Sequence, residues 1–100
     1  MQINVNDVLT QLDGTPLKDM VNGEAKDATV GMAIINALLA PAEGDNGVKK
    51  VQKYELAMRV YKNDSVDITV EEATLIKECV GRAFAPIIVG QLFALLDGKK

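Results

Sequence analysis

The chain has 100 residues, of which 48% are hydrophobic, and its formal net charge is −3. This length and apolar content predict one domain with a hydrophobic core and exclude an intrinsically disordered chain. Because histidine and tryptophan are absent and there are only two tyrosines and two phenylalanines, the chain lacks the commonest general base and offers few rings on which nucleic-acid bases could stack.

Cysteine content and charge distribution favour a cytoplasmic protein that binds neither nucleic acid nor membranes. Cys79 is the single cysteine, so an internal disulfide is excluded and a reducing compartment is compatible with the sequence. We expect no secretory signal, and no apolar stretch reaches the roughly 20 residues that cross a bilayer. Residues 48–62 carry five basic and one acidic side chains, but a duplex-binding domain is expected to be basic overall.

The N-terminal residues predict a small β element. Apolar residues and asparagines alternate over 3–6, and the Asp-Gly pair at 13–14 stands between apolar residues, which is a strong hairpin signal. An alternative interpretation has Asn6 capping a short helix that ends at residue 14. The Asn-Gly pair at 22–23 marks a second turn, so residues 18–27 are expected at the surface.

A helical pattern begins near residue 28 and continues to 40. Thr29 or Asp27 can cap this helix, and Pro41 ends it because proline disfavours helical geometry in the preceding residue. Its expected buried stripe comprises Val30, Ala33, Ile34, Ala37 and Leu38, widened by Ile35 and Leu39. The loop 42–47 that follows is polar and glycine-rich, but it lacks the ligand order of a calcium-binding EF-hand, so we expect no metal there.

A basic helix is predicted at about 48–62. Its apolar positions recur at helical spacing, at Val51, Tyr54, Met58 and Tyr61, and basic side chains fill much of the remaining surface. The basic side is either a solvated surface or a docking face for an acidic partner protein. The candidate partner-binding residues are Lys49, Lys50, Lys53, Tyr54, Arg59 and, further along the chain, Arg82.

Residues 66–68 predict a brief extended segment that pairs with the N-terminal β element, and a helix at about 70–84 follows. Thr69 and Glu72 have the spacing of a capping box, in which each side chain bonds the other residue's backbone N–H. Cys79 lies on the apolar stripe of this helix, and the chain has no histidine to act as its base. We therefore interpret it as a core thiol and expect no catalytic residues.

The last predicted helix, at about 86–97, is apolar nearly all round, which is typical of a helix buried on most sides. Pro86 suits its first turn, and Asp97 with Gly98 ends it, followed by Lys99 and Lys100. Gln91 within it is expected to tie two helices together or to cross a dimer interface, and Gly90 with Ala94 would let a second helix approach. Arg82, just before it, is expected to bond the preceding helix's last carbonyls or an acid.

Together these elements predict a mainly α fold: a compact four-helix domain with a small N-terminal β element, or hairpin. Residues 1–100 form a single domain, with a β or irregular element at 1–27 and a helical bundle at 28–97. No metal or cofactor site is expected.

Four segments carry a resemblance to a known group of proteins: NALLA at 36–40, YELAMRVY at 54–61, EATLIK at 72–77 and APIIVGQ at 85–91. The chain resembles, over about 5–97, a group of small uncharacterised proteins of tailed bacteriophages and prophages. The resemblance implies a phage protein made in the bacterial host cytoplasm and transfers no site residues.

The leading hypothesis is a small non-enzymatic binding protein, an inhibitor or adaptor, that acts on a host or phage protein. One alternative is a phage morphogenesis factor, such as a tail-assembly chaperone or minor structural protein. Another is an oligomeric sponge that holds a small anionic ligand with Lys49, Lys53, Arg59 or Arg82. Homo-oligomerisation is left open.

Overall fold

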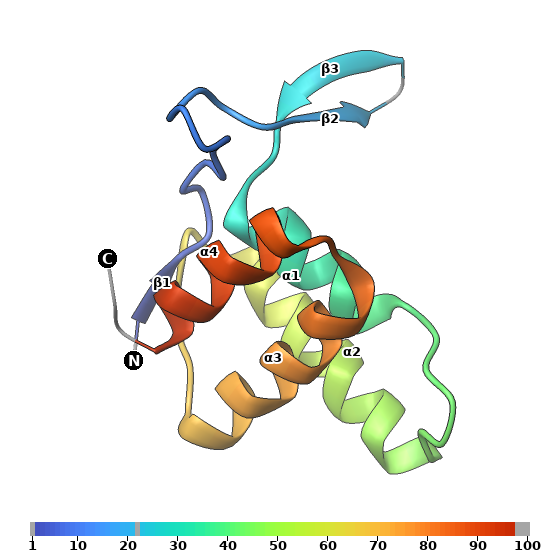
Figure 1. Cartoon of the computed structure of the whole chain (residues 1–100). Helices are drawn as coiled ribbons and strands as arrows, with labels where there is room; N and C mark the ends of the chain where they lie inside the picture. Colours follow the sequence, from blue (N-terminus) through green and yellow to red (C-terminus); the bar gives the residue numbers. More distant parts are fainter. Residues whose placement is uncertain (1, 22, 98–100) are drawn as a thin grey trace.

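The computed structural model describes residues 2–21 and 23–97, and within them the chain forms four helices and four short strands (Figure 1). The helices are α1 (Val30–Leu39), α2 (Gly47–Lys62), α3 (Val70–Ala83) and α4 (Pro86–Leu96). The strands are β1 (Gln2–Asn4), β2 (Lys18–Val21), β3 (Glu24–Asp27) and β4 (Ser65–Asp67). The mainly α class and all four predicted helices are confirmed.

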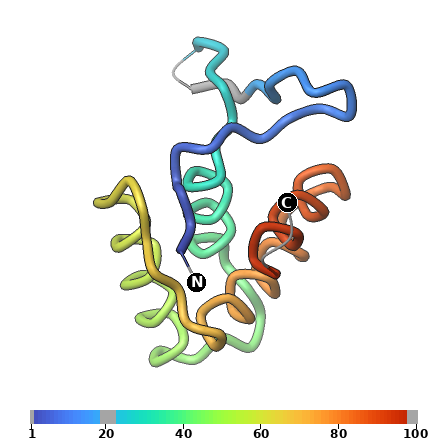
Figure 2. Tube along the Cα trace, turned by 90° about the vertical axis from the view of Figure 1, so that its left-hand side faces the viewer, coloured from blue at the N-terminus to red at the C-terminus, as the bar shows by residue number. Residues whose placement is uncertain are grey.

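Helix α1 lies at the centre of the helical body. Figure 2 shows it between α2 on one side and α3 with α4 on the other, and it packs against both α2 and α3. Its buried residues are Val30, Gly31, Ala33, Ile34, Ala37 and Leu38, as the predicted stripe requires. Leu39 was expected to widen this stripe but is 56% exposed, because it lies outside the arc that α2 and α3 cover.

Helix α4 is not the central element that its composition predicts. Leu92 and Leu96 are its buried residues, whereas most of its other apolar side chains are only half-buried. The reason is its position, since α3 is its principal helical contact and its other side lies at the edge of the body (Figure 1). Gly98, Lys99 and Lys100, predicted to end this helix, lie outside the described residues.

Gln91 links α4 to the N-terminal segment and not to another helix. Its Oε1 accepts hydrogen bonds from the Thr10 N–H at 2.9 Å and the Thr10 hydroxyl at 3.3 Å. Its Nε2 donates to the carbonyls of Thr10 at 2.7 Å and Ile87 at 2.8 Å. These bonds use both donors and both acceptor sites of the amide. The expectation of a helix-to-helix link or a dimer contact through Gln91 is therefore wrong.

A small antiparallel pair joins the N-terminal segment to the segment between α2 and α3. Strand β1 pairs with β4, with Ile3 opposite Val66, and both of these side chains are buried. The Val5 N–H extends the contact by donating to the Asp64 carbonyl at 3.0 Å. The predicted pairing of the 66–68 segment with the N-terminal element is confirmed, although the strand itself covers 65–67.

The predicted hairpin lies later in the chain than the Asp-Gly signal. Strands β2 and β3 pair in antiparallel register over 18–27 and project from the helical body (Figure 1). Lys18 and Asp27 face one another in this pair and form an ion pair. Of the Asn-Gly pair predicted to form a turn, Asn22 lies outside the described residues, and Gly23 has a φ of 81°, in the left-handed region that suits glycine.

The Asp-Gly pair forms a tight loop, and no helix forms over 6–14. Gln11 donates to the Thr15 carbonyl at 2.7 Å, and the Asp13 carboxylate accepts from the Thr15 hydroxyl at 2.7 Å. An isolated bridge between Thr10 and Pro16 closes the loop. The turn was predicted correctly, whereas the alternative capped helix is wrong because these local bonds hold the chain in a reversal.

Local chemistry sets the helix ends as predicted. The Thr29 hydroxyl accepts from the Met32 N–H at 3.3 Å, and Ala40, before Pro41, is extended with ψ of 135°. The capping box of α3 is complete, with the Glu72 N–H donating to the Thr69 hydroxyl at 3.1 Å and the Thr69 N–H donating to the Glu72 carboxylate at 2.9 Å. Pro86 opens α4.

Gly31 allows the N-terminal segment to lie directly against α1. Its N–H donates to the Val5 carbonyl at 2.9 Å. A Cβ at position 31 would lie 2.9 Å from the Val5 Cβ and 3.0 Å from the Val5 carbonyl oxygen. Those atoms belong to the backbone or adjoin it, so they move only if the chain moves.

We expect Gly31→Ala to lower the free energy of unfolding by about 1 kcal/mol, because overpacking costs about 1–3 kcal/mol and alanine's helix propensity returns about 1. Gly90→Ala is the matched control, since position 90 is helical and a Cβ there would meet no atom within 4 Å. It should raise stability by up to about 1 kcal/mol. Urea unfolding followed by circular dichroism measures both free energies of unfolding. A change in the same direction for the two substitutions would contradict this account.

Candidate functional site

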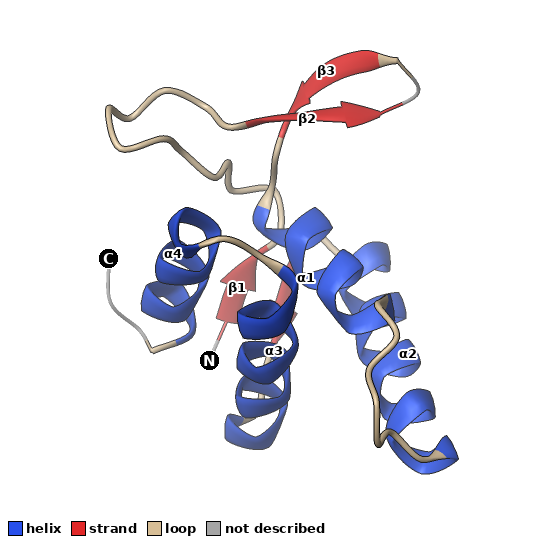
Figure 3. Cartoon of the chain, turned by 45° about the vertical axis from the view of Figure 1, so that its right-hand side comes forward, coloured by secondary structure: helices blue, strands red, loops and turns tan. Residues whose placement is uncertain are grey.

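Helix α2 turns its predicted apolar stripe outward and buries a different row of side chains. Its buried residues are Lys53, Leu56, Ala57 and Val60, which face the other helices. The exposed fractions are 54% for Val51, 57% for Tyr54 and 75% for Tyr61. The predicted stripe therefore lies mostly at the surface, with only Met58 half-buried. In Figure 3, α2 forms the outer edge of the helical body.

The buried face of α2 instead contains Lys53, which is only 3% exposed. Its Nζ donates to the Asp45 carboxylate, whose side chain is only 6% exposed. Gly44 has a φ of 85°, which glycine adopts without strain and which turns the loop toward α2. This hydrogen bond and the charge of Lys53 lower the pKa of Asp45 despite its burial. Lys53 is thus not available as the predicted docking residue.

Two further cations of the predicted face are also engaged. The Lys49 Nζ lies 3.7 Å from the Glu78 carboxylate and 3.9 Å from that of Asp45. The Arg59 guanidinium lies 2.6 Å from the Glu72 carboxylate and donates to the Asp67 carbonyl at 3.3 Å. Lys49 and Arg59 therefore link α2 to α3 and to β4.

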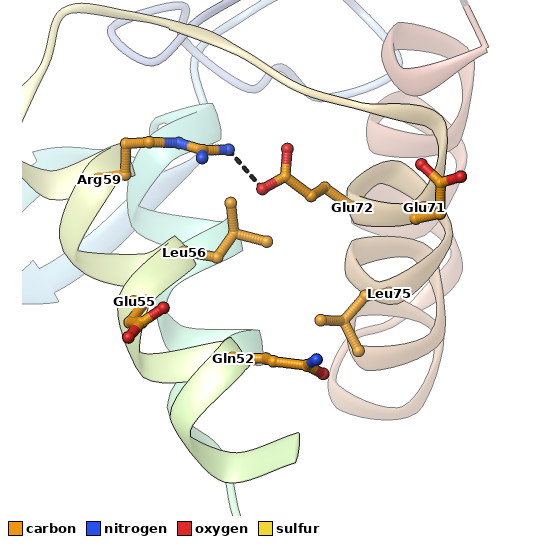
Figure 4. Close-up of a pocket in the computed structure, with 7 residues that line it drawn as sticks. All are labelled: Gln52, Glu55, Leu56, Arg59, Glu71, Glu72 and Leu75. Carbon is orange, nitrogen blue, oxygen red and sulfur yellow. Dashed lines mark hydrogen bonds and ion pairs between the residues drawn. The ribbon is translucent and has the colours of Figure 1, made fainter. Parts of the chain in front are cut away.

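A cleft of about 480 Å³ opens between α2 and α3. It is lined by Gln52, Glu55, Leu56, Arg59, Glu71, Glu72 and Leu75. In Figure 4, Arg59 and Glu72 reach toward one another across it, whereas Glu71 points away. Burial raises the pKa of Glu72, but hydrogen bonds from the Thr69 N–H and from Arg59 outweigh it and leave the pKa below its usual value. Glu72 is thus held ionised in a structural role.

Arg82 lines a different hollow, of about 300 Å³, beside Pro41 and the start of the following loop. It is exposed, and its Nη2 lies 3.9 Å from the Cys79 sulfur. Within the described part of the chain it forms neither the carbonyl bond nor the ion pair expected of it. Cys79 is buried, at 2% exposed, which confirms the core thiol.

A groove of about 290 Å³ runs between the end of α1 and α2. Leu39 and Tyr54 line it together with Lys50, and both Leu39 and Tyr54 are more than half exposed. Lys50 and, at the far end of the helix, Lys62 are exposed and form no ion pair with any described residue. We define the α2 face as Leu39, Lys50, Val51, Tyr54, Met58, Tyr61 and Lys62.

The structure therefore brings Lys50 and Tyr54 of the predicted residues together on one surface and assigns Lys49, Lys53 and Arg59 to internal contacts. Sequence reasoning missed Leu39 because periodicity placed it on the core stripe of α1. Tyr61 and Val51 were recognised as apolar positions, but a 3.6-residue period does not say which side of a helix faces inward.

No protein family, curated protein or solved structure matches this chain. Within residues 2–21 and 23–97, no helix has the length and apolar character needed to cross a bilayer. The same residues contain no group of three or more cysteine or acidic side chains placed to hold a metal ion. The functional interpretation thus rests on the geometry of the α2 face.

Proposed function

We propose that this protein is a small non-enzymatic binding protein, an inhibitor or adaptor, that docks onto a host or phage protein through the α2 face. The observation that carries the proposal is the exposure of Val51, Tyr54 and Tyr61 along one side of a helix. Contact between contiguous apolar side chains and water is unfavourable, and such exposed patches mark interaction sites. Tyrosine and methionine are also enriched at protein interfaces.

A second apolar row on α2 strengthens this proposal. The helix already buries Leu56, Ala57 and Val60 in the core, so the exposed row of Val51, Tyr54 and Tyr61 is one that the fold itself does not cover. Lys53 is buried beside the inner row, and burying its ammonium group requires the ion pair with Asp45. Exposed tyrosines and a buried lysine on one helix suit a surface that a second protein covers.

The alternative functions receive less support. An anionic sponge would need Lys49, Lys53, Arg59 or Arg82 to meet a ligand, but the first three are already paired with carboxylates. A morphogenesis factor would also dock through the α2 face. It differs from an inhibitor or adaptor only in its partner, which would be a virion protein. We favour the inhibitor or adaptor and regard virion partners as an outcome of the same capture experiment.

The test is affinity capture from lysates of the bacterial host, uninfected and phage-infected, with the Tyr54→Ser/Tyr61→Ser double variant beside wild type. We expect wild type to retain at least one protein that the variant loses, because the two rings supply most of the exposed aromatic area. Mass spectrometry identifies the protein and shows whether it is of host or virion origin.

Leu12→Ser is the matched control, since Leu12 is 97% exposed and lies on the N-terminal loop, outside the α2 face. It removes an exposed apolar side chain without altering the proposed site, so it should capture the same proteins as wild type. Circular dichroism establishes that all three proteins are folded. If the double variant captures what wild type captures, the α2 face is not the docking site.

A further inference from the structure

We propose that the occupant of the α2 face is an amphipathic helix with acidic residues beside its apolar stripe. This inference rests on the proposed function and adds the chemistry of the partner. It follows from the shape of the face, the lysines at its two ends and the incomplete charge pairing that a second copy of this chain would offer.

The shape of the face fits a helix. Val51, Tyr54, Met58 and Tyr61 lie in one row along α2, and the row from Val51 to Tyr61 is about 15 Å long. Such a row offers ridges and grooves into which a second helix can pack lengthwise. The groove of about 290 Å³ beside Tyr54, bounded by Leu39, provides a pocket for one apolar side chain of the partner.

The charges of the face select an acidic partner. Lys50 and Lys62 stand near opposite ends of the apolar row, both exposed and both without a carboxylate partner among the described residues. Glu55, the acidic residue of α2, lines the cleft with α3 and also borders the row beside Val51 and Met58, so the edges of the face carry two cations and one anion. A partner with aspartate or glutamate beside its apolar stripe would pair with both lysines and fix its register.

A second copy of this chain matches the face less well than an acidic helix does. Helical spacing places Lys50 on one flank of the apolar row and Glu55 and Lys62 on the other flank. In a parallel pair of α2 helices, Lys50 would lie beside Glu55 of the other copy, but Lys62 would have no acid opposite it. In an antiparallel pair with Tyr54 opposite Met58 of the other copy, Glu55 would lie close to its own counterpart, and these like charges oppose association.

The test is a display selection with a library of helical peptides of about 18 residues, long enough to cover the row, against the full chain. The residues on one face of the helical peptide are randomised, and the residues on its opposite face are kept constant. We expect the selected peptides to carry apolar residues at three- and four-residue steps with aspartate or glutamate on the flanks. A parallel selection against the Lys50→Glu/Lys62→Glu variant should yield no acidic enrichment.

Direct binding of the selected peptides quantifies the effect by fluorescence anisotropy. The Lys50→Glu/Lys62→Glu variant should bind them about tenfold or more weakly, because two exposed attractive pairs become repulsive. Raising the salt concentration should weaken wild-type binding, because exposed charges are screened beyond about 10 Å at 0.1 M. Lys26→Glu, which makes one such charge reversal on β3, outside the α2 face, should bind as wild type does.

The outcomes separate this inference from the proposed function. Peptides that lack acidic enrichment but lose binding to Tyr54→Ser/Tyr61→Ser would overturn the acidic-partner inference and leave the docking face intact. Peptides that bind this variant as they bind wild type, or a selection without binders, would overturn the inference at this surface. Light scattering that shows a wild-type dimer abolished by the same double variant would identify a second copy as the occupant and also overturn it.

Discussion

Lys53→Met is expected to lower the melting temperature by on the order of 10 °C, because it leaves the enclosed Asp45 carboxylate without its cation. The Lys53 Nζ donates to Asp45, and both side chains are almost wholly buried. Lys49, at 3.9 Å from Asp45, compensates only in part. Thermal unfolding followed by circular dichroism at pH 7 measures the change. The adjacent exposed Lys50→Met should leave the melting temperature within a few degrees of wild type.

The Lys53→Met/Asp45→Leu double variant separates loss of the ion pair from loss of packing. Removing both charged groups leaves no unpaired charge, so a large part of the lost stability should return. If the double variant is as unstable as the sum of the two single variants, the pair is not coupled and this explanation of the buried lysine is wrong.

The same pair predicts a pH dependence with a definite sign. Because the hydrogen bond from Lys53 lowers the folded-state pKa of Asp45, the stability from the pair is fully present above the unfolded pKa, which is about 3.9, and is lost as the pH falls through the folded value. In Lys53→Met, burial without a cation favours the protonated acid. The difference in melting temperature between wild type and variant should therefore shrink below about pH 4. An equal difference at pH 7 and pH 3 would contradict this.

Gln91→Leu is expected to lower the free energy of unfolding by about 2–3 kcal/mol, because it leaves the N–H and carbonyl of Thr10 without partners. Leucine preserves the volume and helix propensity, so the lost hydrogen bonds dominate the change. Hydrogen exchange at the Thr10 amide should accelerate in the variant, since the Gln91 Oε1 accepts from that N–H at 2.9 Å. Urea unfolding and native-state exchange measure the two effects.

Gln52→Leu is the control for this substitution. Gln52 is exposed on α2, so the same chemical change there should alter stability by no more than about 0.5 kcal/mol. If Gln91→Leu and Gln52→Leu had equal effects, the tie between α4 and the N-terminal loop would contribute nothing to stability.

The ends and types of the helices can be predicted from the sequence, because they depend on groups a few residues apart. The Thr69–Glu72 capping box, Pro41 after α1 and Pro86 at the start of α4 act on their own backbone neighbours. For the same reason the turn at Asp13-Gly14 was predicted and is found. The predicted N-terminal β element within 1–27 is present, but its paired strands are β2 and β3, and only an isolated bridge forms around Asp13-Gly14, because strand pairing depends on which segments meet and not on the turn signal alone.

Which helix is central and which side of α2 faces inward depend on how whole elements pack together. Amphipathic periodicity does not say which of two apolar rows on α2 faces inward. Helix α1 is the principal contact of α2, the row of Leu56, Ala57 and Val60 is buried, and Asp45 supplies a buried partner for Lys53 on that side. Gln91 finds its partner in Thr10, 81 residues away. Contacts at such separations arise from the packing of whole elements, so the outward tyrosines of the α2 face emerge only when the chain is folded.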